Sequence, residues 1–341
     1  MTITNPLSYS EQELSQSPLA NLCRVTLDNF KQVTKQYALF HICFFSLAFL
    51  ELVVFVLFFS FLTQTTLFAF SLAALFLTGF TYFVLLFYFQ AKKPQQLLDV
   101  HAFFLNHCKN LIPSGSSSLE ASFFVVNALE HFLVVLHRQE YAYYALPHSF
   151  QTLSPLMQKF SAWVHWKDLY KMKELILTTL IREQVDLVKC RPTDLKTHAN
   201  LASAYLNLSE LYTDPRKLYP EEPHPWVSPD YESPFLLKKR EKALLKALEE
   251  YKILSFYAPH EPWVHEQLAQ IYCHLDRPQE AIHAYETILA KISEDTNILL
   301  RLGVLYFENG DHARALRLYE QLKSMHSPLA EELISYYDQN H

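Results

Sequence analysis

Two similar segments lie end to end in the second half of this sequence, in 262-PWVHEQLAQIYCHLDRPQEAIHAYETILAKISEDTNILLRLGVLYFENGDHARALRLYEQLKSMHSPL-329. Their matching positions are 34 residues apart, and these are Leu268 and Leu302, Ala269 and Gly303, Tyr272 and Tyr306, Ala281 and Ala315, and Tyr285 and Tyr319. A constant spacing of this length predicts a solenoid of stacked helix pairs. We expect the small residues where the two helices of one repeat cross, because they let the backbones approach closely.

The order of these residues resembles the tetratricopeptide repeat (TPR) family. Its signature is a Leu-Gly/Ala pair, then Tyr, Ala, an aromatic residue, a small or apolar residue and Pro. The two copies depart from it modestly, since Ile288 and Leu322 replace the small residue and Ser293 and Ser327 replace the Pro. The resemblance implies an all-α fold that binds protein or peptide partners through a concave face made by the first helix of each pair.

A third repeat is split by an insertion. Leu201, Ala202 and Tyr205 fit its first helix, whereas the second-helix positions come only at Ala247 and Tyr251. The sequence therefore predicts three TPR-like repeats over residues 195–327, the first interrupted by a proline-rich insertion at about 208–238. The prolines favour extended or turn structure. The insertion either packs on the solenoid through its aromatic residues or contacts a partner. Residues 328–341 are expected to form a capping helix and tail, which a solenoid needs at its end.

The resemblance also places the partner-binding residues. The strip of Leu300, Val304 and Phe307 on the expected concave face predicts an apolar or amphipathic peptide as the partner. The family's clamp for acidic carboxyl-terminal peptides uses paired Lys and Asn, and only Lys196 and Asn207 are of that type here. The candidate partner-binding residues are Trp263, Gln270, His274, Leu300, Val304, Phe307 and, in the insertion, Trp226.

Two long apolar runs precede the repeats, at residues 37–62 and 67–89, and the second has no charged residue. Each exceeds the ~20 residues that span a bilayer as a helix. They predict a two-span transmembrane hairpin over residues 37–90, with spans at about 38–62 and 67–89. Lysine and arginine flank the hairpin on both sides and the short loop has none, so both termini are expected in the cytoplasm.

Glu51 falls near the middle of the first expected span. A carboxylate at this depth costs a few kcal/mol and usually faces protein or water. Folding the hairpin at Gln64 and Thr65 brings Glu51 level with Thr78 and Gly79. It either fixes helix packing or an oligomer contact, as a protonated or Thr-bonded group, or it belongs to an ion or proton path.

The remaining segments give weaker patterns. Residues 1–36 are expected to form a polar arm that becomes helical as it nears the membrane, and residues 91–194 a helical region in which degenerate repeats are one interpretation. Within the latter we predict a helix at 95–111, a second at 119–138 that is buried or lies on the membrane surface, and two helices within 153–191. Ser117 or Ser118 is the expected cap of the second helix. Trp163 and Trp166 are expected to pack in a core.

Composition argues against several classes of function. A net charge of -6 does not suit nucleic-acid binding, which needs a basic surface. Four glycines in 341 residues cannot build a phosphate-binding loop. The five cysteines are scattered singly, and no histidine pair has the spacing of a helical zinc site. We therefore predict neither an enzyme nor a cofactor, and the less favoured enzyme interpretation would need a site in residues 95–190.

The patterns together predict an all-α protein, with an N-terminal two-helix transmembrane hairpin, an α-solenoid of TPR-type helix pairs and a C-terminal capping helix. Such a protein would be a membrane-anchored scaffold or adaptor that binds a protein or peptide on the cytoplasmic side of a lipid bilayer. As an alternative, a close hydrophobic pair with both termini on one side resembles the inclusion-membrane proteins secreted by certain intracellular bacteria. The TPR domain would then face the host cytosol.

Overall fold

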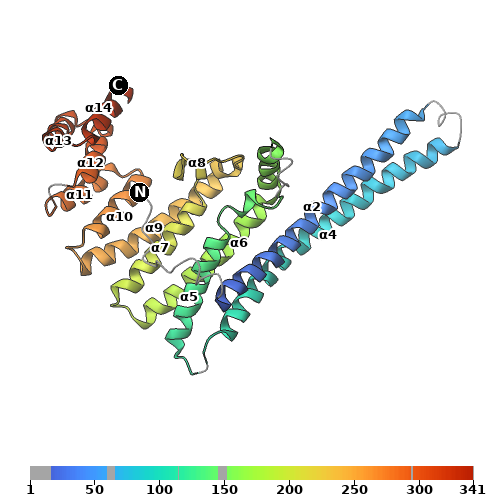
Figure 1. The fold of residues 1–341 in the computed structure, drawn as a ribbon, viewed down its shortest axis with the longest axis horizontal. Helices are drawn as coiled ribbons and strands as arrows, with labels where there is room; N and C mark the ends of the chain where they lie inside the picture. Colours follow the sequence, from blue (N-terminus) through green and yellow to red (C-terminus); the bar gives the residue numbers. More distant parts are fainter. Residues whose placement is uncertain (1–16, 60–65, 114, 145–151, 293–294, 341) are drawn as a thin grey trace. The chain divides into compact units, whose positions relative to one another are not determined.

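The computed structural model describes residues 17–59, 66–113, 115–144, 152–292 and 295–340, and every regular element in these ranges is a helix (Figure 1). The predicted all-α fold class is thereby confirmed. The chain forms two compact units. Unit 1 comprises residues 1–183 and 221–228, and unit 2 comprises residues 184–220 and 229–341.

Helix α2 (Pro18–Leu57) opens unit 1 as one continuous helix. Ser17 caps it by accepting a hydrogen bond from the backbone N–H of Ala20, and Pro18 occupies the first turn, where its missing N–H costs nothing. Leu22, Leu27 and Phe30 are buried, so residues 18–36 are part of a packed core. The part of the N-terminal arm that was expected to become helical is thus a helix packed in this core, and residues 1–16 lie outside the described ranges.

Helix α4 (Leu67–Asn110) pairs with α2 along its length (Figure 1). The predicted break between a span at 67–89 and a helix at 95–111 does not occur, because α4 continues through Pro94. Proline removes one backbone hydrogen bond but leaves the flanking ones in place. Beyond Pro94 the helix buries Leu97, Val100 and Phe104, and this burial offsets the lost bond.

Helix α5 (Ser118–Val135) is capped by Ser117, one of the two serines expected in that role. Ser117 and Glu120 form a capping box, in which the Ser117 hydroxyl accepts from the Glu120 N–H while the Glu120 carboxylate accepts from the Ser117 N–H. One face of α5 packs on α2 and α4. Phe132, near the C-terminal end of α5, lies 4.6 Å from Phe104 between ring centroids. A single turn, η1 (Gln139–Tyr141), follows.

Helix α6 (Ser154–Cys190) is one helix where the sequence suggested two. Leu169, Met172 and Ile176 are buried, which gives the helix a continuous apolar face through the expected break. The core prediction for Trp163 is wrong, since 62% of this side chain is exposed. Trp166 stacks on Tyr170 at 5.4 Å and is half-buried.

Unit 2 starts with the split repeat, in which α7 (Leu195–Leu211) packs against α9 (Pro234–Tyr257). The irregular insertion is shorter than predicted, because Ser233 caps α9 and Pro234 begins it. Two short helices, α8 (Pro215–Leu218) and η3 (Pro229–Glu232), lie within it. Pro215 and Pro234 therefore lie in the first turns of helices. The sequence pattern had predicted only extended or turn structure for the prolines of the insertion.

The two regular repeats follow as α10 (Pro262–His274) with α11 (Pro278–Leu289), and α12 (Thr296–Glu308) with α13 (His312–Ser324). Asp276 and Gly310 occupy equivalent turns and both have a positive φ, of 54° and 78°. This left-handed conformation favours Gly and is tolerated by Asp. The two repeats therefore match at their turns also in backbone conformation, 34 residues apart.

Helix α14 (Leu329–Asn340) closes unit 2 as the predicted capping helix. Leu333 is fully buried against α12, and a Cβ added at Gly303 would lie 2.7 Å from Leu333 Cδ2. Gly303 therefore makes room for the following helix, a contact that the expected crossing within its own repeat did not include.

Candidate partner-binding face

The first helices α10 and α12 carry most of the predicted partner-binding residues. An ion pair links the two helices, because the Arg301 guanidinium of α12 lies 3.7 Å from the Glu266 carboxylate of α10. Arg301 also forms a side-chain hydrogen bond with Tyr285 of α11. These contacts join the two repeats along the side on which the candidate residues lie.

Three candidates lie on α10. Trp263 is 43% exposed, and its ring meets Tyr251 of α9 edge to face at 6.3 Å. Gln270 is half-buried and donates to Glu266 over 3.3 Å. His274 ends the helix with an exposed side chain, and crowding by the surrounding protein, together with the positive charge of Arg240, lowers the pKa of its imidazole. This part of the surface therefore presents an indole, an amide and a neutral imidazole at pH 7.

The predicted apolar strip on α12 is only partly available. Leu300 and Val304 are half-buried at the edge of the core. Phe307 is 3% exposed, and its ring lies 4.8 Å from Tyr337 of α14. The capping helix thus covers Phe307, while Tyr336 of the same helix donates to Glu308 over 2.7 Å. Sequence spacing assigned Phe307 to the first-helix face but could not show that α14 covers it.

The remaining candidate, Trp226, belongs to unit 1 and is not brought together with the others. Its ring meets Trp166 of α6 edge to face at 6.3 Å, and its carbonyl accepts from the Tyr141 hydroxyl over 3.4 Å. Nearby, Arg138 pairs with Glu222 at 2.5 Å and donates to the Pro223 carbonyl at 3.0 Å. Residues 221–228 of the insertion therefore pack in unit 1, an arrangement that neither sequence-based alternative described.

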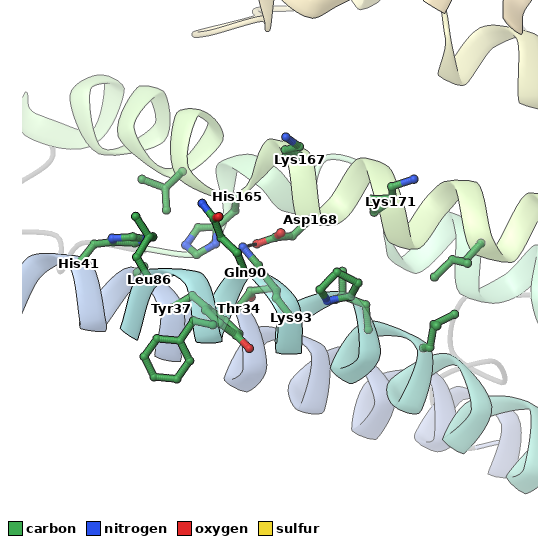
Figure 2. Close-up of a pocket in the computed structure, with 17 residues that line it drawn as sticks. Thr34, Tyr37, His41, Leu86, Gln90, Lys93, His165, Lys167, Asp168 and Lys171 are labelled. Atoms are coloured by element: carbon green, nitrogen blue, oxygen red, sulfur yellow. Dashed lines mark ion pairs between the residues drawn. The ribbon is translucent and has the colours of Figure 1, made fainter. Parts of the chain in front are cut away.

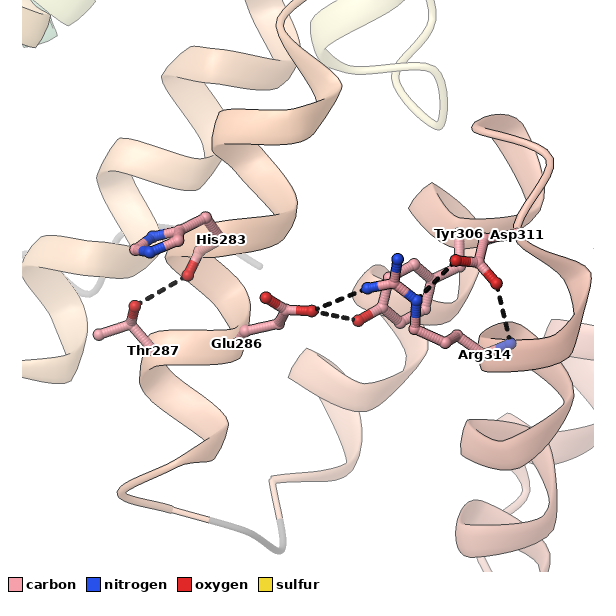
Figure 3. Close-up of polar contacts among 6 residues, drawn as sticks. All are labelled: His283, Glu286, Thr287, Tyr306, Asp311 and Arg314. Atoms are coloured by element: carbon pink, nitrogen blue, oxygen red, sulfur yellow. Dashed lines mark hydrogen bonds and ion pairs between the residues drawn. The ribbon is translucent and has the colours of Figure 1, made fainter.

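A polar cluster that sequence reasoning missed ties the last two repeats together (Figure 3). Glu286 of α11 accepts from the Tyr306 hydroxyl of α12 at 2.6 Å and from Arg314 of α13 at 3.3 Å. Arg314 in turn donates to Asp311 at 2.6 Å. Burial and the neighbouring Glu286 carboxylate raise the pKa of Tyr306 to about 12. The Tyr of the repeat signature thus contacts, through its hydroxyl, the same Glu286 that pairs with Arg314 across the two repeats.

The side chains of this face suit binding. Among the described residues no group of three or more His, Cys, Asp and Glu side chains is placed to hold a metal ion. Cys273 on α10 is half-buried, and burial raises the pKa of its thiol. The groups presented are hydrogen-bonding and apolar side chains on rigid helices, which is what peptide recognition requires.

Antiparallel helix pairs that repeat every 34 residues and end in a capping helix define unit 2 as a helical-repeat domain. Residues 274–327 match the family model described as "Tetratricopeptide repeat", so this chain carries tetratricopeptide repeats. A solved thermophilic TPR protein from Thermus thermophilus is similar, with 17% identity, over 65% of this chain and 91% of that one, at a TM-score of 0.32. A comparison with curated protein sequences finds no match. Tetratricopeptide repeats are protein-interaction modules, which makes unit 2 a scaffold for protein contacts.

Proposed function

We propose that this protein is a membrane-anchored scaffold. The α2–α4 hairpin holds it in a lipid bilayer with both termini in the cytoplasm, and the repeats of unit 2 bind a protein or peptide partner there. The observation that carries the anchor is the exposed surface of the hairpin. In the most apolar 18-residue window of each of these two helices, no residue is buried.

The exposed side chains of the hairpin are mostly large and apolar. Phe49 is 68% exposed, Phe70 74% and Phe76 76%, and they lie on two helices that pack against each other. Burying apolar surface is favourable by about 25 cal/mol per Å². A contiguous surface of this kind would aggregate in water and suits the hydrocarbon of a bilayer.

Three helices, at Pro18–Leu57, Leu67–Asn110 and Ser118–Tyr141, are long and apolar enough to cross a membrane. We assign only the first two as spans. In the third, a third of the most apolar window is buried, because Val125, Leu129 and Phe132 pack on α2 and α4. The outer ends of the hairpin also carry basic residues, including Lys35 and Lys92, which favours a cytoplasmic location for both.

For the partner we favour a peptide with an apolar or amphipathic face. Trp263, Leu300 and Val304 supply apolar contact area, and Gln270 and His274 supply hydrogen bonds at its edge. Phe307 would join them only if α14 moved, so we leave it out of the proposed contact set. Buried aromatic and aliphatic anchors with a polar rim are the usual basis of such interfaces.

The anchor is tested by alkaline carbonate extraction of membranes that contain the full chain. Topology is tested in a cysteine-free variant with a single cysteine at Thr66, in the hairpin turn, or at Ser335, on α14. We expect the chain to resist extraction, and an impermeant maleimide added to intact cells to label Thr66→Cys alone. Release by carbonate, or labelling of Ser335→Cys from outside, would contradict the anchor or its orientation.

The partner face is tested by crosslinking and mass spectrometry of proteins that co-purify with the full chain. One sample carries Trp263→Ala, Leu300→Ser and Val304→Ser. The matched control carries Ile292→Ser and Leu316→Ser, which change apolar residues that are 43% and 45% exposed outside the first helices. A partner kept in the control and lost in the first variant supports the proposal, whereas an unchanged set of partners in both overturns it.

A further inference from the structure

A pocket of about 800 Å³ lies in unit 1 between the α2–α4 hairpin and α6 (Figure 2). Its apolar lining includes Leu86, Phe89 and Leu97 from α4 and Val164 and Leu175 from α6. Its polar lining consists of Thr34, Tyr37, His41, Gln90, Lys93, His165, Lys167, Asp168 and Lys171. The partner-binding face of unit 2 contributes nothing to it.

The depth of this pocket follows from helix geometry. A helix rises 1.5 Å per residue, so a hydrocarbon core of about 30 Å takes up about 20 residues. Counted from Leu67, the start of α4, that length ends close to Tyr88. Leu86 and Phe89 then lie at the edge of the hydrocarbon, and Lys93 lies about one helical turn beyond it. This is the level of lipid headgroups.

The charge of the lining is positive. Lys93, Lys167 and Lys171 oppose the single carboxylate of Asp168. Asp168 is already engaged, since it lies 2.7 Å from the Lys93 ammonium. Lys171 lies 3.0 Å from Glu174 but its side chain is 56% exposed. Lys167 is exposed and forms no ion pair among the described residues. Lys167 and Lys171 therefore add positive charge beside the pocket, and the Lys167 side chain lies on the side of α6 that faces away from the hairpin (Figure 2).

A buried histidine adds a hydrogen-bonding group to the pocket. His165 is 0% exposed, stacks on Tyr143 at 3.9 Å and shares a hydrogen bond of 2.9 Å between its Nε2 and the Tyr144 hydroxyl. Its Nδ1 has no hydrogen-bond partner in the part of the chain that the structure describes. A buried polar atom without a partner costs about 1–3 kcal/mol, so a ligand that meets it gains affinity.

The His165 imidazole is in a protonation state in which it can donate a hydrogen bond to an oxygen atom of a ligand. Burial, and then the positive charges of Lys93 and Lys35, lower the pKa of its imidazole to about 4. The ring is neutral at pH 7, and it carries one N–H. When Nε2 accepts from the Tyr144 hydroxyl, that proton is on Nδ1, the atom that has no partner within the described ranges.

We propose that this pocket binds the phosphate headgroup of an anionic membrane lipid. The positive charges of Lys167 and Lys171 attract the phosphate electrostatically, the His165 Nδ1–H donates to one of its oxygens, and an acyl chain lies along Leu86 and Phe89. Lysine is a suitable point charge for phosphate, and each basic side chain near an anionic surface adds about 1 kcal/mol of attraction. The inference rests on the proposed membrane hairpin, because only that placement puts the pocket at headgroup level.

Native mass spectrometry of the full chain in neutral detergent tests the proposal. The protein is titrated with short-chain phosphatidylglycerol, with phosphatidylcholine of the same chain length, and with inorganic phosphate. The test variant carries Lys167→Gln and Lys171→Gln, which remove two exposed charges and keep the fold. The matched control carries Lys109→Gln and Lys159→Gln, two exposed lysines on α4 and α6 that do not line the pocket.

We expect one tightly bound phosphatidylglycerol per chain, and affinity reduced roughly thirtyfold in the test variant but unchanged in the control. Equal binding of phosphatidylcholine, equal loss in both variants, or no loss in either would overturn the proposal. Binding of inorganic phosphate alone would also overturn it, in favour of a soluble anion. Carbonate extraction of the same preparations reports separately on the membrane hairpin, so that failure of the anchor is distinguished from failure of the pocket.

Discussion

The Thr78 hydroxyl of α4 donates a hydrogen bond of 2.9 Å to Glu51 Oε1 of α2. This bond joins the two helices midway along the hairpin. Hairpin folding had predicted that Glu51 lies level with Thr78, and the structure confirms the pairing. A carboxyl bonded to the neighbouring helix is the arrangement expected of a packing contact, and it favours that interpretation over an ion path.

Thr78→Val should therefore weaken the hairpin. The substitution keeps the shape of the side chain and removes the donor, at a cost of about 0.6–1.7 kcal/mol for a hydrogen bond between membrane helices. Unfolding of the full chain by sodium dodecyl sulfate in mixed micelles measures the change. Ser71→Ala is the control, because that hydroxyl bonds only to the Phe68 carbonyl of its own helix. Equal stability of the Thr78→Val variant and the wild type would show that the hydrogen bond between Thr78 and Glu51 does not stabilise the hairpin.

Lys93→Met should destabilise unit 1 by about 3–5 kcal/mol, because Asp168 would keep a buried charge without its partner. The double variant Lys93→Met/Asp168→Leu should recover most of this loss. Chemical denaturation of the two variants in one detergent compares them. A double variant no more stable than the single one would mean that the ion pair is not the cause.

The same pair predicts a pH dependence. Burial raises the pKa of Asp168, and Lys93 opposes that rise. A carboxyl whose folded-state pKa exceeds its unfolded value binds more protons when folded, so folding gains stability as the pH falls through the folded pKa. Without Lys93 the rise is larger. The Lys93→Met variant should regain stability relative to wild type between pH 7 and pH 5, and a constant difference over that range would contradict the assignment.

Gly303→Ala should loosen the capping helix, since the new Cβ would meet Leu333 Cδ2 at 2.7 Å. Overpacking of this kind costs about 1–3 kcal/mol. Leu333→Ala alone should cost about 2–5 kcal/mol because the side chain is fully buried. The double variant should be less destabilised than the sum of the two, since the smaller residue 333 makes room for the methyl group. Additive losses in thermal unfolding would show that the two residues are not coupled.

His198 gives the stability of unit 2 a pH dependence as well. Here hydrogen-bond partners raise the pKa, whereas burial raises the pKa of Asp168. The Nδ1 of His198 lies 2.6 Å from Glu250 and its Nε2 lies 3.0 Å from the Pro192 carbonyl. Burial lowers the pKa of His198, but the bonds to Glu250 and Pro192 outweigh it and raise the pKa above its ordinary value. The stability from this raised pKa is present in full below the unfolded-state pKa and is lost as the pH rises through the folded one.

We therefore expect wild-type stability to fall between about pH 6.5, the unfolded value, and the higher folded pKa. His198→Gln should remove this part of the pH profile and cost about 1.5–3 kcal/mol at pH 6, the range for a hydrogen bond to a charged group. Thermal unfolding at several pH values provides both quantities. The exposed His283→Gln serves as control, and equal pH profiles for the two variants would argue against the pair.

Local and periodic signals in the amino-acid chain were enough to predict several elements. The 34-residue register placed α10 to α13, and apolar runs longer than a bilayer indicated the hairpin. A Ser and a Glu three residues apart predicted the cap of α5. Each of these signals depends on residues within one or two helices, so no knowledge of distant neighbours was needed.

Tertiary packing, by contrast, was needed to establish where helices stay continuous and which faces are covered. Pro94 does not end α4 and no break divides α6, because packing against other helices stabilises them through those points. Phe307 has the spacing of a surface residue but lies under α14. Trp226 packs in unit 1, and the lining of the pocket comes from three helices far apart in the chain. Such features depend on contacts between segments that are distant in the sequence. A local sequence pattern carries no information about the free energy of those contacts.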